Sequence, residues 1–176
     1  GAADQAITVG AIDDKDTIDG GDDSIASYSN SGPRESDGDS DEDEELKPDV
    51  VAPGSDMMSA RHAESTSQIP GTPKPLAKDS YHELSGTSMA CPAVAGLVAV
   101  ILQISQEEGL DLDPQDVKEI LRENSEPRGE ASEPDISDTW NDKYGFGIID
   151  GNRIISALLG DGGGGGGEGG GGGGGG

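Results

Sequence analysis

The 176-residue sequence is poor in positive charge, in aromatic side chains and in cysteine. Only 11 Lys and Arg stand against 36 Asp and Glu, which gives a formal net charge of −25. Because nucleic-acid phosphates are bound by clustered Lys and Arg, these few scattered cations argue against a nucleic-acid partner. Cys91 is the only cysteine, so an intrachain disulfide is excluded. Its place in an apolar segment predicts a buried, unreactive thiol.

Long hydrophobic runs are also lacking. The longest, Met89 to Leu102, has roughly 14 residues, fewer than the ~20 that a transmembrane helix needs. We therefore expect a core helix here and no membrane span. The N-terminus carries no recognisable signal peptide, although the sequence begins with Gly1 rather than with Met.

Acidic side chains are abundant, and one run gathers seven of them: Asp37, Asp39, Asp41, Glu42, Asp43, Glu44 and Glu45. We interpret this run as a solvated surface loop. A calcium site is the alternative, since Ca²⁺ takes about six to eight oxygen ligands, but the run lacks the spaced glycine of an EF-hand loop. The remaining sequence is acidic too, and salt relieves such self-repulsion because the Debye length is only ~3 Å at molar salt. The composition therefore suggests a halophilic source.

The sequence predicts one domain over residues 1–160, followed by a flexible tail over 161–176. From Gly162 onward every residue is glycine except Glu168, so the tail cannot bury apolar surface. Within the domain, strand and helix signals alternate, which predicts an α/β fold with a largely parallel sheet. Strands are expected at 6–12 and 48–54, with a weaker signal at 24–30 and a short strand or turn at 144–149. Helices are expected after residue 88, at 113–124 and at 151–159, and loops at 13–23, 55–79 and 126–138.

Ser88 lies at the transition from a strand to a helix. A nucleophile gains there because Gly86 permits a sharp turn and the helix N-terminus directs free N–H groups at developing negative charge. The spacing is not the Gly-x-Ser-x-Gly of α/β-hydrolases, since Ala90 stands where the second glycine would be. The alternative is that Thr87 or Ser88 only caps the helix.

The string from Ser85 to Gly96, SGTSMACPAVAG, closely resembles the nucleophile motif of the subtilisin-like serine proteases, or subtilases. Four further segments resemble landmarks of this family and follow in the family's order: Ala6–Ala11, Ile25–Pro33, Lys47–Gly54 and Tyr144–Gly147. Many subtilases have His where this sequence has Ala93, a position outside the catalytic set.

The resemblance implies a three-layer subtilisin-like fold with a mainly parallel sheet, and it assigns the nucleophile to Ser88. In this family the triad Asp, the triad His and the oxyanion Asn all precede the strand that ends in Val-Gly-Ala, which Ala6–Ala11 resembles here. We therefore expect them upstream of Gly1, with the N-terminal part of the domain missing from this chain. His62 and His82 do not occupy the family's histidine position.

The implied function is a serine endopeptidase that hydrolyses peptide bonds through an acyl-enzyme on Ser88 and is incomplete in this chain. The alternative is an inactive remnant, or a complementing fragment that binds only peptide or a partner half. The chemistry requires no cofactor, structural calcium stays open, and the partners are a protein or peptide substrate and the missing N-terminal portion. The family also implies an extracellular location. Missing early strands would leave a sheet edge exposed, which favours aggregation of the isolated chain.

Overall fold

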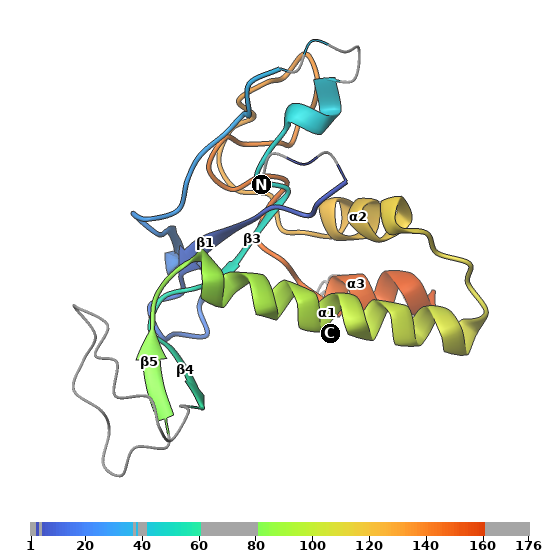
Figure 1. Ribbon diagram of the computed structural model, residues 1–176, viewed down its shortest axis with the longest axis horizontal. Helices are drawn as coiled ribbons and strands as arrows, with labels where there is room; N and C mark the ends of the chain where they lie inside the picture. The colour runs from blue at the N-terminus through green and yellow to red at the C-terminus, as the bar shows by residue number, and fades with distance from the viewer. Residues whose placement is uncertain (1–2, 4, 37, 39–41, 61–80, 161–176) are drawn as a thin grey trace, which may run out of the picture.

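The computed structural model describes residues 3, 5–36, 38, 42–60 and 81–160. The predicted tail at 161–176 therefore lies outside the described residues, as does most of the predicted loop at 55–79. Two sheets and three helices make up the described part (Figure 1).

The first sheet has the strand order β2-β1-β3. Strands β1 (Val9–Asp13) and β3 (Val50–Pro53) are parallel, with Gly10 opposite Val51. Strand β2 (Ser24–Ile25) runs antiparallel to β1 and is much shorter than the sequence suggested. It ends early because the Ala11 N–H bonds to the Ser29 hydroxyl (3.0 Å) rather than to a backbone carbonyl.

The second sheet pairs β4 (Met57–Ala60) with β5 (Tyr81–Leu84) in antiparallel fashion. The prediction of a loop at 55–79 was wrong for β4. Its residues are mostly exposed and gain their strand conformation by pairing with a segment more than twenty positions away. Short 3₁₀ turns occur at Gly20–Asp22 and Glu42–Glu45.

The helices are α1 (Thr87–Glu108), α2 (Pro114–Glu123) and α3 (Gly151–Leu159). The predicted boundaries of α2 and α3 are confirmed to within one residue, because strong local signals set them. Asp113 forms a reciprocal capping box with Asp116 at the start of α2. Asp150 caps α3 by accepting from two backbone N–H groups.

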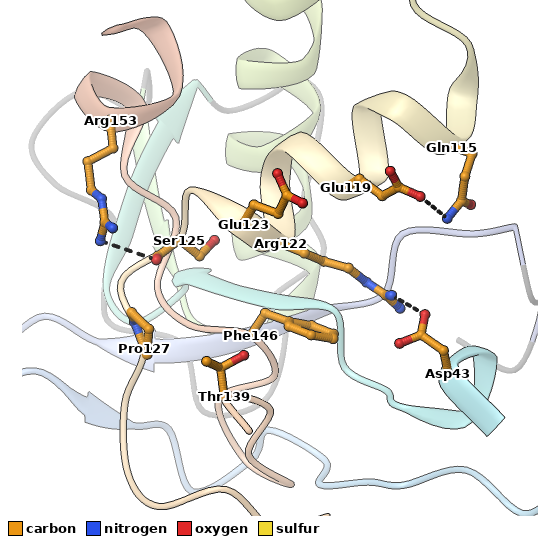
Figure 2. Close-up of a pocket in the computed structure, with 10 residues that line it drawn as sticks. All are labelled: Asp43, Gln115, Glu119, Arg122, Glu123, Ser125, Pro127, Thr139, Phe146 and Arg153. Atoms are coloured by element: carbon orange, nitrogen blue, oxygen red, sulfur yellow. Dashed lines mark hydrogen bonds and ion pairs between the residues drawn. The ribbon is translucent and has the colours of Figure 1, made fainter. Parts of the chain in front are cut away.

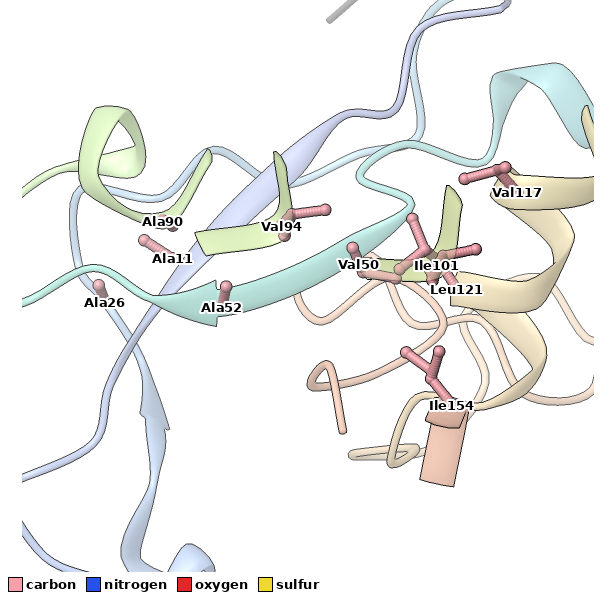
Figure 3. Close-up of a cluster of buried hydrophobic side chains, with 10 residues drawn as sticks. All are labelled: Ala11, Ala26, Val50, Ala52, Ala90, Val94, Ile101, Val117, Leu121 and Ile154. Carbon is pink, nitrogen blue, oxygen red and sulfur yellow. The ribbon is translucent and has the colours of Figure 1, made fainter. Parts of the chain in front are cut away.

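The hydrophobic core lies between the first sheet and the helices (Figure 3). Helix α1 contacts β1, β3 and α3, and buried side chains of α2 join the same core. The fully buried residues of the core come from β1, β3, α1, α2 and α3: Ala11, Val50, Ala52, Ala90, Ile101, Leu121 and Ile154. This helix-on-sheet packing confirms the predicted α/β class.

One face of α1 stays uncovered. The helix is buried at Ala90, Val94, Ile101 and Ser105, which share one side, whereas its other side exposes apolar residues such as Leu102 (49% exposed). Cys91 lies on the uncovered side and is exposed, so the prediction of a buried thiol was wrong. Among the described residues, α1 alone has the length and mean hydropathy (1.9) to cross a membrane, a test that core helices of soluble proteins also pass.

Candidate active site

The Ser85–Gly96 motif begins in the turn between β5 and α1, which Ser85 and Gly86 form. Gly86 is the N-cap residue of α1 in an extended conformation (φ 162°, ψ 161°), and no side chain caps the helix. Ser88 is therefore the second residue of the helix and is exposed. The simple capping role that the sequence left open for Thr87 or Ser88 is not what the structure shows.

The first turn of α1 offers backbone donors beside this hydroxyl. The Met89 N–H bonds to the Gly86 carbonyl (2.9 Å), and the N–H groups of Thr87 and Ser88 precede the first intrahelical donor positions. A helix N-terminus also carries positive potential from its aligned peptide dipoles. An oxyanion formed next to Ser88 Oγ would therefore meet both a donor and a favourable field.

Gly54 brings the end of β3 against this turn. The Gly86 N–H donates to the Gly54 carbonyl at 2.8 Å. A β-carbon on Gly54 would lie 2.8 Å from the Gly86 carbonyl oxygen and 2.8 Å from the Ala11 β-carbon. The end of the strand predicted at 48–54 is therefore a close contact that fixes where α1 begins. Figure 1 shows this start of α1 beside the carboxyl ends of β1 and β3.

The described residues do not bring a catalytic base to Ser88. His62 lies outside the described residues, and of His82 only the backbone is described, paired with Ser59 in the second sheet. No histidine side chain thus belongs to the part of the chain that the structure describes.

A second candidate site is a cavity of about 440 Å³ beside α2 (Figure 2). Arg122 crosses it, with its guanidinium 4.5 Å from the centre of the Phe146 ring and 2.5 Å from an Asp43 oxygen. Arg153 points to the other side, where it donates to the Ser125 carbonyl (3.3 Å). This cavity lies near the start of β3, where Arg122 bonds to Asp49, whereas the turn before Ser88 meets the other end of β3 at Gly54.

The charged groups behind this cavity have a structural role. Asp49 is fully buried, and its carboxylate accepts from the Lys47 ammonium (3.0 Å), from Arg122 (2.8 Å) and from the Thr8 N–H (2.6 Å). The Lys118 ammonium lies 3.8 Å away, and burial, followed by the nearby Arg122 charge, lowers the pKa of Lys118. The Lys-Pro-Asp part of the sequence motif therefore anchors β3 to α2 and not to the turn before Ser88.

The acidic run takes part in this anchoring. Asp43 pairs with Arg122, and Glu44 lies 3.8 Å from Arg34. The run therefore does more than face solvent, because these two surface carboxylates also form ion pairs. Among the described residues, no group of three or more His, Cys, Asp or Glu is arranged to hold a metal ion. The alternative of a calcium site stays open.

The described residues form an α/β protein. In it an exposed serine lies in the first turn of a long helix, and this turn contacts the carboxyl end of a parallel strand. The chain matches the Subtilase family over residues 1–147. It therefore belongs to the subtilases, the subtilisin-like serine proteases.

Individual relatives agree with this assignment. Serine protease AprX of Bacillus subtilis (strain 168) is 37% identical over 150 residues, which are 85% of this chain and 29% of that protein. The prenylagaramide maturation protease PagA superposes with a TM-score of 0.54 at 27% identity, over 87% of this chain and 42% of that one. Fervidolysin from Fervidobacterium pennivorans gives a TM-score of 0.57 at 21% identity, over 86% of this chain and 19% of that one, which shows the fold alone. The predicted family and fold class are confirmed, and the chain spans less than half of each of these proteins.

Two residues that contact the turn before Ser88 were not identified from the sequence as parts of the site. Gly54 was identified only as the end of a predicted strand and of a family landmark, and Asp56 only as part of a predicted loop. The pairing of Gly54 with Gly86 across 32 positions leaves no local signal, because it depends on how β3 meets α1.

Proposed function

We propose that this chain is the nucleophile-bearing part of a serine endopeptidase, with Ser88 as the attacking residue. The observation that carries the proposal is the exposed Ser88 in the first turn of α1, within a Gly-Thr-Ser sequence and unused as a cap. The general base, its orienting Asp and the oxyanion Asn come in this proposal from chain that precedes Gly1 in the whole protein. The substrate is a protein or peptide.

The reaction is an acyl transfer in two halves. Ser88 Oγ attacks the scissile carbonyl carbon while the histidine accepts the hydroxyl proton. The carbonyl oxygen becomes an oxyanion, which the Ser88 N–H and the asparagine side chain stabilise. The tetrahedral intermediate then collapses, and the histidine gives its proton to the leaving amine. Water repeats the sequence on the acyl-enzyme and releases the second product and free Ser88.

The chain by itself is proposed to be inactive. A serine hydroxyl without a base is a poor nucleophile, and removal of the general base costs several orders of magnitude in rate. In this proposal α1 carries the nucleophile and one oxyanion donor, but the described residues include no histidine side chain that could accept the proton.

The test uses the whole protein, including the chain that precedes Gly1. Hydrolysis of a casein-type substrate and labelling by a fluorophosphonate should both disappear in Ser88→Ala and persist in Ser27→Ala, an exposed serine matched in chemistry. The 176-residue chain should show neither activity. Binding of peptide without turnover by the whole protein, unaffected by Ser88→Ala, would establish the non-enzymatic alternative instead.

We also propose that the protease acts outside the cell. Support comes from a relative named the extracellular basic protease of Dichelobacter nodosus, 28% identical over 113 residues, which cover 64% of this chain and 16% of that protein. Activity that depends on Ser88 should appear in the culture medium of the source organism, and its confinement to the cell fraction would contradict the proposal.

A further inference from the structure

The residue before the Gly-Thr-Ser turn is tied to the loop after β3 by two reciprocal hydrogen bonds. The Asp56 N–H donates to Ser85 Oγ at 2.9 Å, and the Ser85 hydroxyl donates to Asp56 Oδ1 at 3.1 Å. The two residues are 29 positions apart in the chain. A single serine hydroxyl thus serves as acceptor and donor to the same partner, which fixes both its rotamer and the approach of the two segments.

Asp56 holds a backbone conformation that favours this contact. Its φ of 53° lies in the left-handed region, which few residues other than glycine adopt. Aspartate and asparagine tolerate this region better than other residues because their short polar side chains bond locally. A residue keeps such an unfavourable backbone conformation where surrounding contacts stabilise it, and at Asp56 the two bonds to Ser85 do so.

The Asp56–Ser85 pair stands between two backbone links that join the same segments. On one side the Gly86 N–H bonds to the Gly54 carbonyl (2.8 Å), and on the other side Met57 pairs with Leu84 at the start of the second sheet. Both Asp56 and Ser85 are exposed, so neither contributes to the hydrophobic core. Their hydrogen bonds therefore stabilise the local geometry of the turn that leads to Ser88.

We propose that Asp56 and Ser85 are positioning residues that hold the Gly86-Thr87-Ser88 turn against the end of β3. The inference deepens the proposed function, on which its catalytic part rests. A nucleophile works within a narrow geometric tolerance, and a displacement of about 1 Å can cost about 10²-fold in rate. Loss of the pair therefore lowers kcat and leaves KM almost unchanged, because substrate contacts elsewhere remain.

The first experiment compares variants of the whole protein. Ser85→Ala removes both bonds, and Asp56→Gly keeps the left-handed backbone while removing the carboxylate. Both should lower kcat about 10-fold at constant KM. Asp56→Asn keeps an acceptor oxygen and the backbone preference, so it should retain kcat within about twofold. Ser59→Ala, an exposed serine in β4, is the matched control and should match the unmodified protein.

The second experiment does not depend on proteolysis. Amide hydrogen exchange at Gly86 should accelerate about 10-fold in Ser85→Ala and Asp56→Gly, while exchange at Val51 in β3 stays the same. If the whole protein shows no activity that depends on Ser88, the proposed function fails, and the exchange data still decide the role of the pair. Unchanged Gly86 exchange in both variants, or equal losses of kcat in Asp56→Asn and Asp56→Gly, would overturn the inference.

Discussion

The backbones of Gly54 and Gly86 meet without room for a side chain on Gly54. Their hydrogen bond is 2.8 Å long, and a β-carbon on Gly54 would lie 2.8 Å from the Gly86 carbonyl oxygen. Real β-carbons essentially never approach another heavy atom this closely, so one of the two backbones would have to move. The end of β3 and the start of α1 thus depend on each other.

Gly54→Ala should therefore destabilise the fold by about 1–3 kcal/mol, as overpacked positions do. Urea unfolding measures this change. Gly96→Ala is the matched control, because a β-carbon at Gly96 meets nothing within 4 Å and the residue lies inside α1. It should stabilise the protein by about 1 kcal/mol through helix propensity. Equal effects of the two substitutions would contradict the close contact.

Asp49→Asn should cost about 3–5 kcal/mol of unfolding free energy. The substitution preserves shape but leaves the buried cations Lys47, Lys118 and Arg122 without their shared buried carboxylate. Urea unfolding again gives the measurement, and Asp13→Asn, at an exposed pair with Lys15, should have little effect. A loss at Asp49 no greater than at Asp13 would show that the buried cluster is not needed.

The lowered pKa of Lys118 predicts a pH dependence of stability. Below its folded pKa the lysine is charged in both states, and burial disfavours the folded one. As the pH rises toward the ordinary lysine pKa of about 10.4, the folded state loses the proton first, so Lys118 contributes increasing stability.

Lys118→Met should remove that rise from a plot of unfolding free energy against alkaline pH. Lys15 serves as the control, because its contribution to stability changes with pH in the opposite direction. Its bond to Asp13 raises the pKa of Lys15. Its contribution is present below the unfolded pKa and is lost as the pH rises through the folded one. Identical profiles for the unmodified protein and Lys118→Met would contradict the prediction.

The net charge of −25 predicts stabilisation by salt. Trp140, the only tryptophan, is fully buried and donates to the Pro48 carbonyl (3.0 Å), so its fluorescence reports unfolding. The thermal midpoint should rise from dilute buffer to molar KCl, and the double variant Glu108→Gln/Asp111→Asn should need less salt for the same midpoint. Greatest stability in dilute buffer would contradict a halophilic source.

The sequence predicted elements best where short-range signals act alone. Asp113 followed by Pro114 fixed the start of α2, and the Gly-Thr-Ser string located the turn before α1. It failed where burial depends on distant partners. Cys91 follows an apolar pattern, yet its side of α1 is uncovered, and β4 exists only through its pairing with β5.

The amino-acid sequence by itself determined the family and the candidate nucleophile, because the SGTSMACPAVAG string and its companion motifs are contiguous. Tertiary structure decided what surrounds Ser88. It set Gly54 against Gly86, bonded Asp56 to Ser85, and sent the Lys-Pro-Asp segment to a buried ion cluster at the opposite end of β3. These contacts join positions about thirty to seventy apart, and no local pattern encodes them, since they arise only when strands and helices pack together.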